Sequence, residues 1–178
     1  MKETPLKINI YGSPVLRKKA KDVEIIDQRV RDTLEEMLQL MYEHQGIGLA
    51  ANQVGLLERM IVIDLGQNPL KLINPRIIKK KKGKVEFEEG CLSLPGTLVR
   101  VRRFNDIVVE ALDTEGRPLE IKAQGLLSVC LQHEIDHLDG RLLIDYLPWR
   151  ARLKEKRRLL EVFKSGGMPQ PTKESEVL

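Results

Sequence analysis

The chain has 178 residues, of which 42% are hydrophobic and 31% are charged, and its formal net charge is +4. This length fits one domain with a hydrophobic core and leaves little room for a second domain. The composition is that of an ordinary soluble protein, and so mild a positive charge does not by itself indicate binding to nucleic acid.

Targeting and membrane signals are not found in the sequence. No run of about 18 apolar residues occurs, so no membrane-spanning helix is expected. The N-terminal residues lack the apolar stretch of a signal peptide, which favours a cytoplasmic location. In that reducing environment Cys91 and Cys130 are expected to be reduced or metal-bound rather than joined in a disulfide.

The first predicted element is a helix over residues 27–45, with Asp27 as its N-cap and Gly46 at its end. Apolar residues recur at helical spacing along one face of this segment: Val30, Leu34, Met37, Leu38 and Met41. The next segment, GIGLAANQVG at 46–55, is typical of tight packing or of close approach between backbone and ligand. Its glycine spacing does not fit the dinucleotide-binding pattern.

Short apolar or alternating segments predict a series of β-strands, at residues 60–65, 71–79, 84–88, 98–102, 106–112 and 118–122. The lysine-rich turn at 79–84 is predicted to be a solvated hairpin tip rather than a nucleic-acid site. The segment EEGCLSLPG at 88–96 interrupts the strand pattern with two glycines and a proline.

A helix is predicted over residues 125–138, and because it is apolar nearly all round it is expected to be buried. It carries an HExxH motif that contains two of the three histidines in the chain, His133 and His137. Positions i and i+4 share one helix face, so both imidazoles can bind one metal ion while Glu134 reaches a metal-bound water. The motif is typical of metal-dependent hydrolysis of a carbonyl group, with Glu134 as the general base.

A catalytic site of this kind needs three protein ligands and one open position. No histidine follows His137, and Glu155 and Glu161 lie in a basic stretch that is typical of a solvated helix. The third ligand is therefore expected upstream, where Cys91 is the best candidate. A structural site would need a fourth ligand, and the chain offers no obvious one.

The last predicted helix runs from Pro148 to about Lys164 and is rich in arginine and lysine. From Ser165 the tail contains two prolines and mixed charges, and we expect it to be disordered. The expected organisation is one domain over residues 1–164 followed by a tail at 165–178.

Three motifs occur in the order GIGLAANQVG, EEGCLSLPG and QHEIDHLDG, the last at 132–140. Together they resemble the three signature motifs of peptide deformylases, and the resemblance extends to about Lys164. It implies an α+β domain with antiparallel or mixed sheets packed around the buried HExxH helix, followed by a C-terminal helix. It also implies that the chain removes the formyl group from the N-terminal formylmethionine of nascent polypeptides and releases formate.

The resemblance implies a divalent metal, commonly Fe(II) with Ni, Co or Zn able to substitute, held by Cys91, His133 and His137. It implies that Glu134 is the general base and that the oxyanion receives hydrogen bonds from the Gln53 side chain and the Leu92 backbone N–H. The remaining implied contacts are to the substrate, at its backbone by Ile47, Gly48, Gly90 and Arg103 and at its methionine side chain by Leu126, Val129 and Cys130.

One departure from the family pattern is Tyr11-Gly12-Ser13, where many members carry a Pro-Asp pair. The basic stretch 150–158 matches the position of the family's C-terminal helix, which in some members docks on the ribosome; a solvated helix face is the alternative. Two other functions remain open. An ordinary HExxH metallopeptidase would take its third ligand downstream, and a ribosome- or RNA-binding module with a structural metal would not need Glu134.

Overall fold

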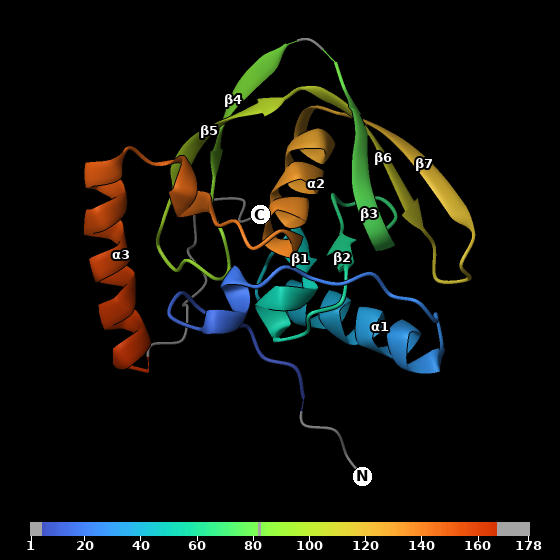
Figure 1. The fold of residues 1–178 in the computed structure, drawn as a ribbon, viewed down its shortest axis with the longest axis horizontal. Coiled ribbons are helices and arrows are strands. Elements are labelled where there is room, and N and C mark those ends of the chain that lie inside the picture. Colours follow the sequence, from blue (N-terminus) through green and yellow to red (C-terminus); the bar gives the residue numbers. More distant parts are fainter. Residues whose placement is uncertain (1–4, 82, 167–178) are drawn as a thin grey trace.

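The computed structural model describes residues 5–81 and 83–166 and is drawn in Figure 1. Its helices are α1 (Gln28–Glu43), α2 (Gly125–Leu138) and α3 (Trp149–Lys164). Its strands are β1 (Gly48–Ala50), β2 (Met60–Ile63), β3 (Leu70–Lys80), β4 (Lys84–Glu89), β5 (Val99–Phe104), β6 (Asp106–Leu112) and β7 (Pro118–Gln124). Short 3₁₀ helices are η1 (Pro14–Arg17), η2 (Ala51–Val54) and η3 (Leu143–Tyr146).

The strands form two antiparallel sheets, one of five strands in the order β1-β2-β3-β6-β7 and one of two strands, β4-β5. Helix α2 contacts strands of both sheets, and Figure 1 shows it beneath the arch that the strands make. This arrangement confirms the predicted α+β class. The lysine-rich turn was wrongly predicted to be a hairpin tip, because β3 pairs with β2 and β6 whereas β4 pairs with β5.

Helix α1 begins as the sequence predicts, with the Asp27 carboxylate accepting a hydrogen bond from the Val30 N–H at 3.0 Å. Its predicted apolar face is buried in the core. The predicted end is wrong in detail, because Gln45 rather than Gly46 takes the left-handed conformation after the helix, with φ 56°. Gly46 serves close packing instead, since a Cβ there would lie 2.9 Å from Leu92 Cδ1.

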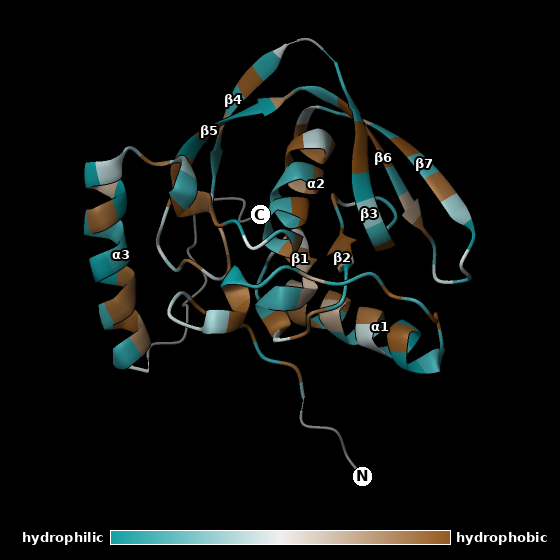
Figure 2. Cartoon of the chain, in the orientation of Figure 1, coloured by the Kyte–Doolittle hydropathy of each residue, from teal (hydrophilic) through white to brown (hydrophobic). Residues whose placement is uncertain are grey.

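Helix α2 lies in the interior, as its apolar surface predicts. Ten of its 14 residues are buried, including both histidines and the glutamate of the HExxH motif. Figure 2 shows hydrophilic residues on this central helix, where an ordinary core helix would be apolar. Buried polar side chains are costly unless they have partners, so this helix marks the part of the core where function is to be sought.

Helix α3 lies at the side of the molecule and has one buried residue, Leu159. Near its end Phe163 packs against Gly12, where a Cβ would lie 2.5 Å from Phe163 Cγ. The glycine that departs from the family pattern thus accommodates this ring. Ser165 caps the helix, and residues 167–178, most of the tail predicted to be disordered, lie outside the described residues.

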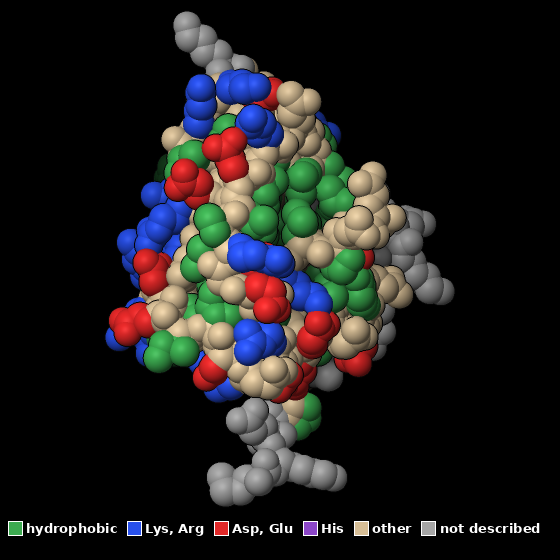
Figure 3. Space-filling model, turned by 90° about the vertical axis from the view of Figure 1, so that its right-hand side faces the viewer, with side chains coloured by type: hydrophobic (Ala, Val, Ile, Leu, Met, Phe, Trp, Pro, Cys, Tyr) green, Lys and Arg blue, Asp and Glu red, His purple; other side chains and the backbone are tan. Residues whose placement is uncertain are grey.

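Figure 3 shows the side of the molecule on which β3, β6 and β7 lie, with apolar side chains gathered on this face and both basic and acidic side chains around them. Within the described residues, none of the helices is both long and apolar enough to span a membrane.

Candidate metal centre and active site

Cys91, His133 and His137 come together in the core. The loop after β4 supplies the thiol and α2 supplies the two imidazoles, and their potential ligand atoms all lie within 4.8 Å of one another. Cys91 Sγ is 3.2 Å from His137 Nε2, and the two imidazole centroids are 5.0 Å apart. All three side chains are buried. The upstream cysteine predicted as third ligand therefore lies beside the HExxH pair.

The polar atoms around this cluster fit a metal ion. Among the described residues, His133 Nε2 and both carboxylate oxygens of Glu134 are buried without a hydrogen-bond partner. Leaving such atoms unpaired costs free energy, which a bound cation and its water offset. A thiolate with two imidazoles suits several first-row transition metals. Because the described residues supply three protein ligands here rather than a closed set of four, the cluster is of the catalytic kind.

Glu89 orients His133, and the sequence analysis did not identify it. Its carboxylate accepts a hydrogen bond from His133 Nδ1 at 2.8 Å, which leaves the Nε2 lone pair free for a metal. Arg103 donates to both oxygens of Glu89, at 2.8 and 2.9 Å. Burial alone would raise the pKa of Glu89, but the hydrogen bonds from Arg103 and His133 outweigh burial and lower it. Glu89 is therefore a buried carboxylate anion.

Arg103 lies in this buried ion pair. Its side chain is 4% exposed, and besides Glu89 it contacts Asp136 Oδ2 at 2.5 Å and the Tyr146 hydroxyl at 3.0 Å, both through Nη1. The residue was expected to contact the substrate backbone. In the structure its three nitrogens contact protein groups, and the substrate contact stays a prediction.

Glu134 lies on α2 between the two histidines and is fully buried. Burial, opposed by the charges of His133 and Arg103, raises the pKa of Glu134 to about 7. A carboxylate of that pKa can take up and release a proton near neutral pH. Strand β1 passes close by, and a Cβ on Gly48 would lie 2.9 Å from Cys130 Sγ and 3.0 Å from the carboxyl carbon of Glu134. Only glycine fits there.

Gln53, on η2, has a fixed amide. Its Oε1 accepts a hydrogen bond from the Ala50 N–H at 2.8 Å. Its Nε2 therefore faces the other way, where it is 3.2 Å from Ser93 Oγ and 3.7 Å from Cys91 Sγ. An N–H donor is thus held beside the three proposed metal ligands. Leu92 follows Cys91 directly in the same loop.

The remaining predicted substrate contacts lie around the start of α2 and β1. Cys130 is fully buried and its thiol is 3.7 Å from the Ile47 carbonyl oxygen. Burial raises the pKa of Cys130, so the thiol stays neutral and forms an apolar surface. Val129 is fully buried, and Leu126 is partly buried against the same core cluster. Gly90 immediately precedes Cys91 and is buried.

Two further residues were missed by sequence reasoning. Asn52 donates from Nδ2 to the His137 carbonyl at 2.6 Å and to the Lys18 carbonyl at 3.0 Å, which ties the end of α2 to η2. Ser93 supports the Gln53 amide. Asn52 lies in the motif GIGLAANQVG and Ser93 in the motif EEGCLSLPG, but the groups that they contact are distant in the sequence. For Glu89 the sequence offers only a general signal, since a metal-ligating histidine often donates its second ring N–H to a carboxylate, but spacing does not show which carboxylate.

The downstream glutamates are not part of the cluster. Glu155 accepts hydrogen bonds from Thr97 and Arg158, and Glu161 pairs with Lys164 on the surface of α3. A buried HExxH helix, a three-ligand cluster completed by an upstream cysteine, and a glutamate between the ligands that has no hydrogen-bond partner in the described part of the chain define a metal-dependent hydrolase. These features distinguish the site from that of a metallopeptidase with a downstream ligand.

The chain belongs to the polypeptide deformylase family, whose model matches residues 5–152. The peptide deformylase of Alkalilimnicola ehrlichii is 46% identical over 165 residues, which cover 90% of this chain and 92% of that protein. The crystal structure of a peptide deformylase from Legionella pneumophila is similar with a TM-score of 0.84 and 42% identity, covering 91% of this chain and 96% of that one. The peptide deformylase of Synechococcus elongatus, solved in complex with actinonin, has a TM-score of 0.81 and 42% identity over 97% of this chain and 93% of that one.

Proposed function

We propose that this protein hydrolyses the N-formyl amide of formylmethionine at the N-terminus of nascent polypeptides, giving formate and a free amine. The observation that carries the proposal is Glu134, which is buried beside the cluster of Cys91, His133 and His137 and has no hydrogen-bond partner within residues 5–81 and 83–166. Membership of the polypeptide deformylase family supports the same reaction.

Cys91 Sγ, His133 Nε2 and His137 Nε2 would hold one divalent metal ion. Fe(II) is our proposed native metal, and Ni, Co or Zn would be able to substitute, since the donor set suits all of them. When bound, such an ion acts as a Lewis acid and makes water a nucleophile near neutral pH.

The protein's own groups supply proton transfer and charge stabilisation. Glu134 would accept the proton of the attacking water and deliver it to the amine as the C–N bond breaks. The Gln53 Nε2–H and the Leu92 backbone N–H would donate hydrogen bonds to the oxyanion that develops on the formyl oxygen. Because Ala50 and Ser93 fix the Gln53 amide, this donor is oriented before the substrate arrives.

The substrate backbone would lie along β1 and beside the end of β4, in contact with Ile47, Gly48 and Gly90. Its methionine side chain would enter an apolar space bounded by Leu126, Val129 and Cys130, which suits a flexible thioether. For Arg103 the buried ion pairs favour a role in holding Glu89 over the substrate contact expected from the family.

Residues 1–164 would form one catalytic domain acting in the cytoplasm. We also propose that α3 is the segment through which the protein meets the ribosome. Support comes from its surface, since Trp149 is 70% exposed and Arg150 lies over its ring at 5.1 Å. A solvated helix remains the alternative, and reversal of the basic charges of α3 followed by ribosome sedimentation separates the two.

Formate release tests the function. Protein loaded anaerobically with Fe(II) or Ni(II) is incubated with a formyl-Met peptide, the matched acetyl-Met peptide and an unformylated peptide. We expect formate from the first alone and no cleavage of internal bonds. Internal cleavage would support a metallopeptidase, and absence of formate would contradict the proposal. Replacing Cys91 by Ser should strip or weaken the bound metal.

A further inference from the structure

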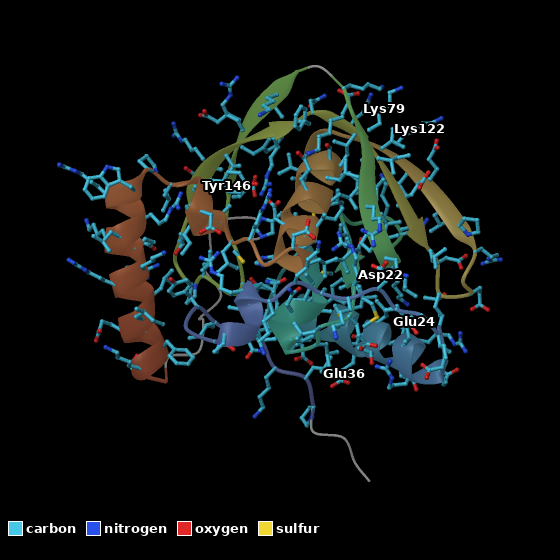
Figure 4. All side chains as sticks on the ribbon, in the orientation of Figure 1. Asp22, Glu24, Glu36, Lys79, Lys122 and Tyr146 are labelled. Atoms are coloured by element: carbon cyan, nitrogen blue, oxygen red, sulfur yellow. The ribbon has the colours of Figure 1, made fainter. Side chains whose placement is uncertain are left out.

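We propose that the Tyr146 hydroxyl is a positioning group for the metal centre, acting on His133 through the buried side chains of Arg103 and Glu89. The inference deepens the proposed function and rests on it. Tyr146 lies on η3, outside the three sequence motifs, and Figure 4 shows it between η3 and α2.

The first contact in this network is made by the proposed metal ligand itself, since His133 Nδ1 is hydrogen-bonded to Glu89 Oε2 at 2.8 Å. Both side chains are buried, with 2% and 0% exposure. The carboxylate can only accept, so the imidazole donates from Nδ1 and presents its Nε2 lone pair to the metal. The direction of that lone pair depends on where Glu89 is held.

Arg103 determines the position of Glu89. Its Nε and Nη2 atoms form a two-pronged pair with the carboxylate, a geometry that fixes orientation as well as distance. The Arg103 side chain is itself only 4% exposed, so bulk water solvates its guanidinium poorly. Its remaining nitrogen, Nη1, must therefore be anchored by protein groups.

Tyr146 and Asp136 form that anchor. The Tyr146 hydroxyl donates to Asp136 Oδ2 at 2.6 Å and accepts from Arg103 Nη1 at 3.0 Å, while Nη1 also reaches Asp136 Oδ2 at 2.5 Å. The guanidinium carbon lies 4.7 Å from the centroid of the Tyr146 ring. Burial, opposed by Arg103 and reinforced by Asp136, raises the pKa of Tyr146 to about 12, so the hydroxyl keeps its proton and donates.

Loss of the hydroxyl removes one of two acceptors from Arg103 Nη1 and one donor from Asp136. Arg141, the other cation that pairs with Asp136 among the described residues, is 4.0 Å away and mostly exposed, so it replaces the lost donor poorly. The guanidinium would then turn more freely, and the carboxylate that orients His133 would turn with it. Groups that orient a metal ligand without contacting the metal typically contribute about 10- to 100-fold to metal affinity or activity.

The test compares Tyr146→Phe with a matched control, Tyr42→Phe. The first variant keeps the ring over Arg103 and removes only the hydroxyl. Tyr42 is 42% exposed against 41% for Tyr146, and its hydroxyl also donates to an aspartate, Asp64, at 2.5 Å. The control therefore loses the same kind of bond without any link to Glu89 or His133.

Both variants are loaded with Co(II). We measure the rate at which a chelator removes the metal, the visible absorption of the bound Co(II), and kcat and KM for formyl-Met peptide. For Tyr146→Phe we expect metal removal about tenfold faster, shifted Co(II) bands, and a lower kcat with KM unchanged. Tyr42→Phe should match the unsubstituted protein in metal removal and spectrum.

Wild-type metal removal and an unshifted Co(II) spectrum in Tyr146→Phe would overturn the inference. Equal losses of thermal stability in both variants with no effect on the metal would also overturn it, because they indicate a structural role only. If the unsubstituted protein released no formate, the proposed function would fail. The metal-removal rate and the spectrum would still decide the role of Tyr146.

Discussion

The surroundings of Glu134 leave its carboxylate free to accept a proton. Neither of its oxygens has a hydrogen-bond partner among the described residues, and Gly48 leaves room for it because a side chain there would press on its carboxyl group. By contrast Glu89 is fully paired and its pKa is lowered. Two buried carboxylates near the three proposed metal ligands thus differ in environment, which fits the roles that we propose for them, proton transfer for Glu134 and orientation of His133 for Glu89.

Gln53→Ala should lower kcat for deformylation by about 100- to 1000-fold, the usual effect of losing one oxyanion donor. Metal content should be unchanged, because the amide only flanks Cys91 at 3.7 Å. Metal analysis and formate release on the same sample measure both quantities. A kcat within about threefold of the unsubstituted protein would show that Gln53 is not a donor to the oxyanion.

The motif residues could be predicted because the helical period alone places His133 and His137 on one face. The missing downstream ligand then favoured Cys91. Glu89 could not be identified in the same way, since its partner His133 lies 44 residues further along the chain. Which side chain meets it depends on the packing of β4 against α2, and sequence spacing does not determine that packing.

Among helices and strands, long periodic segments were predicted best. The bounds of α1 and α2 agree with the sequence to within two residues, because an apolar stripe and an N-cap are local signals. Strand β1 was not predicted, since its three residues are too few to show a period. The strand order within the two sheets was also not predicted, because strand pairing is a contact between distant segments.

Helix α3 is attached to the domain partly through Phe163 and Gly12. Gly12→Ala should destabilise the protein by about 1–3 kcal/mol, because the new methyl overlaps the ring and the backbone has φ +115°. Gly66→Ala is the matched control, with φ +86° and nothing within 4 Å of the added Cβ. Urea denaturation of both variants separates backbone strain from overlap. Equal losses in the two variants would contradict the proposed packing of Phe163.

Across the fold, charged pairs join segments that are far apart in the sequence. Arg17 on η1 pairs with Asp145 on η3 at 2.5 Å, and this carboxylate also accepts from the Leu142 N–H at 2.9 Å. Asp145 directly precedes Tyr146, so the pair fixes the segment that bears the proposed positioning group. Burial would raise the pKa of Asp145, but the hydrogen bonds from Arg17 and Leu142 outweigh it and lower the pKa.

A carboxylate with a lowered pKa stabilises the fold above its unfolded pKa, and that contribution is lost as the pH falls through the folded pKa. Asp145→Asn should therefore cost about 1 kcal/mol at pH 7, since the pair is partly exposed. The difference from the unsubstituted protein should shrink below about pH 4. Urea denaturation at several pH values measures it, with Asp22→Asn in the exposed pair with Arg76 as control. A difference independent of pH would contradict this assignment.

The most direct test of the proposed active site is formate release by Glu134→Ala, with metal content measured on the same sample. The three ligands are untouched, so we expect the metal and the fold to be retained. Formate release from a formyl-Met peptide should fall by at least about 100-fold, because the proton acceptor is gone. A metal-loaded Glu134→Ala protein that keeps a rate within about tenfold of the unsubstituted protein would contradict the proposed mechanism.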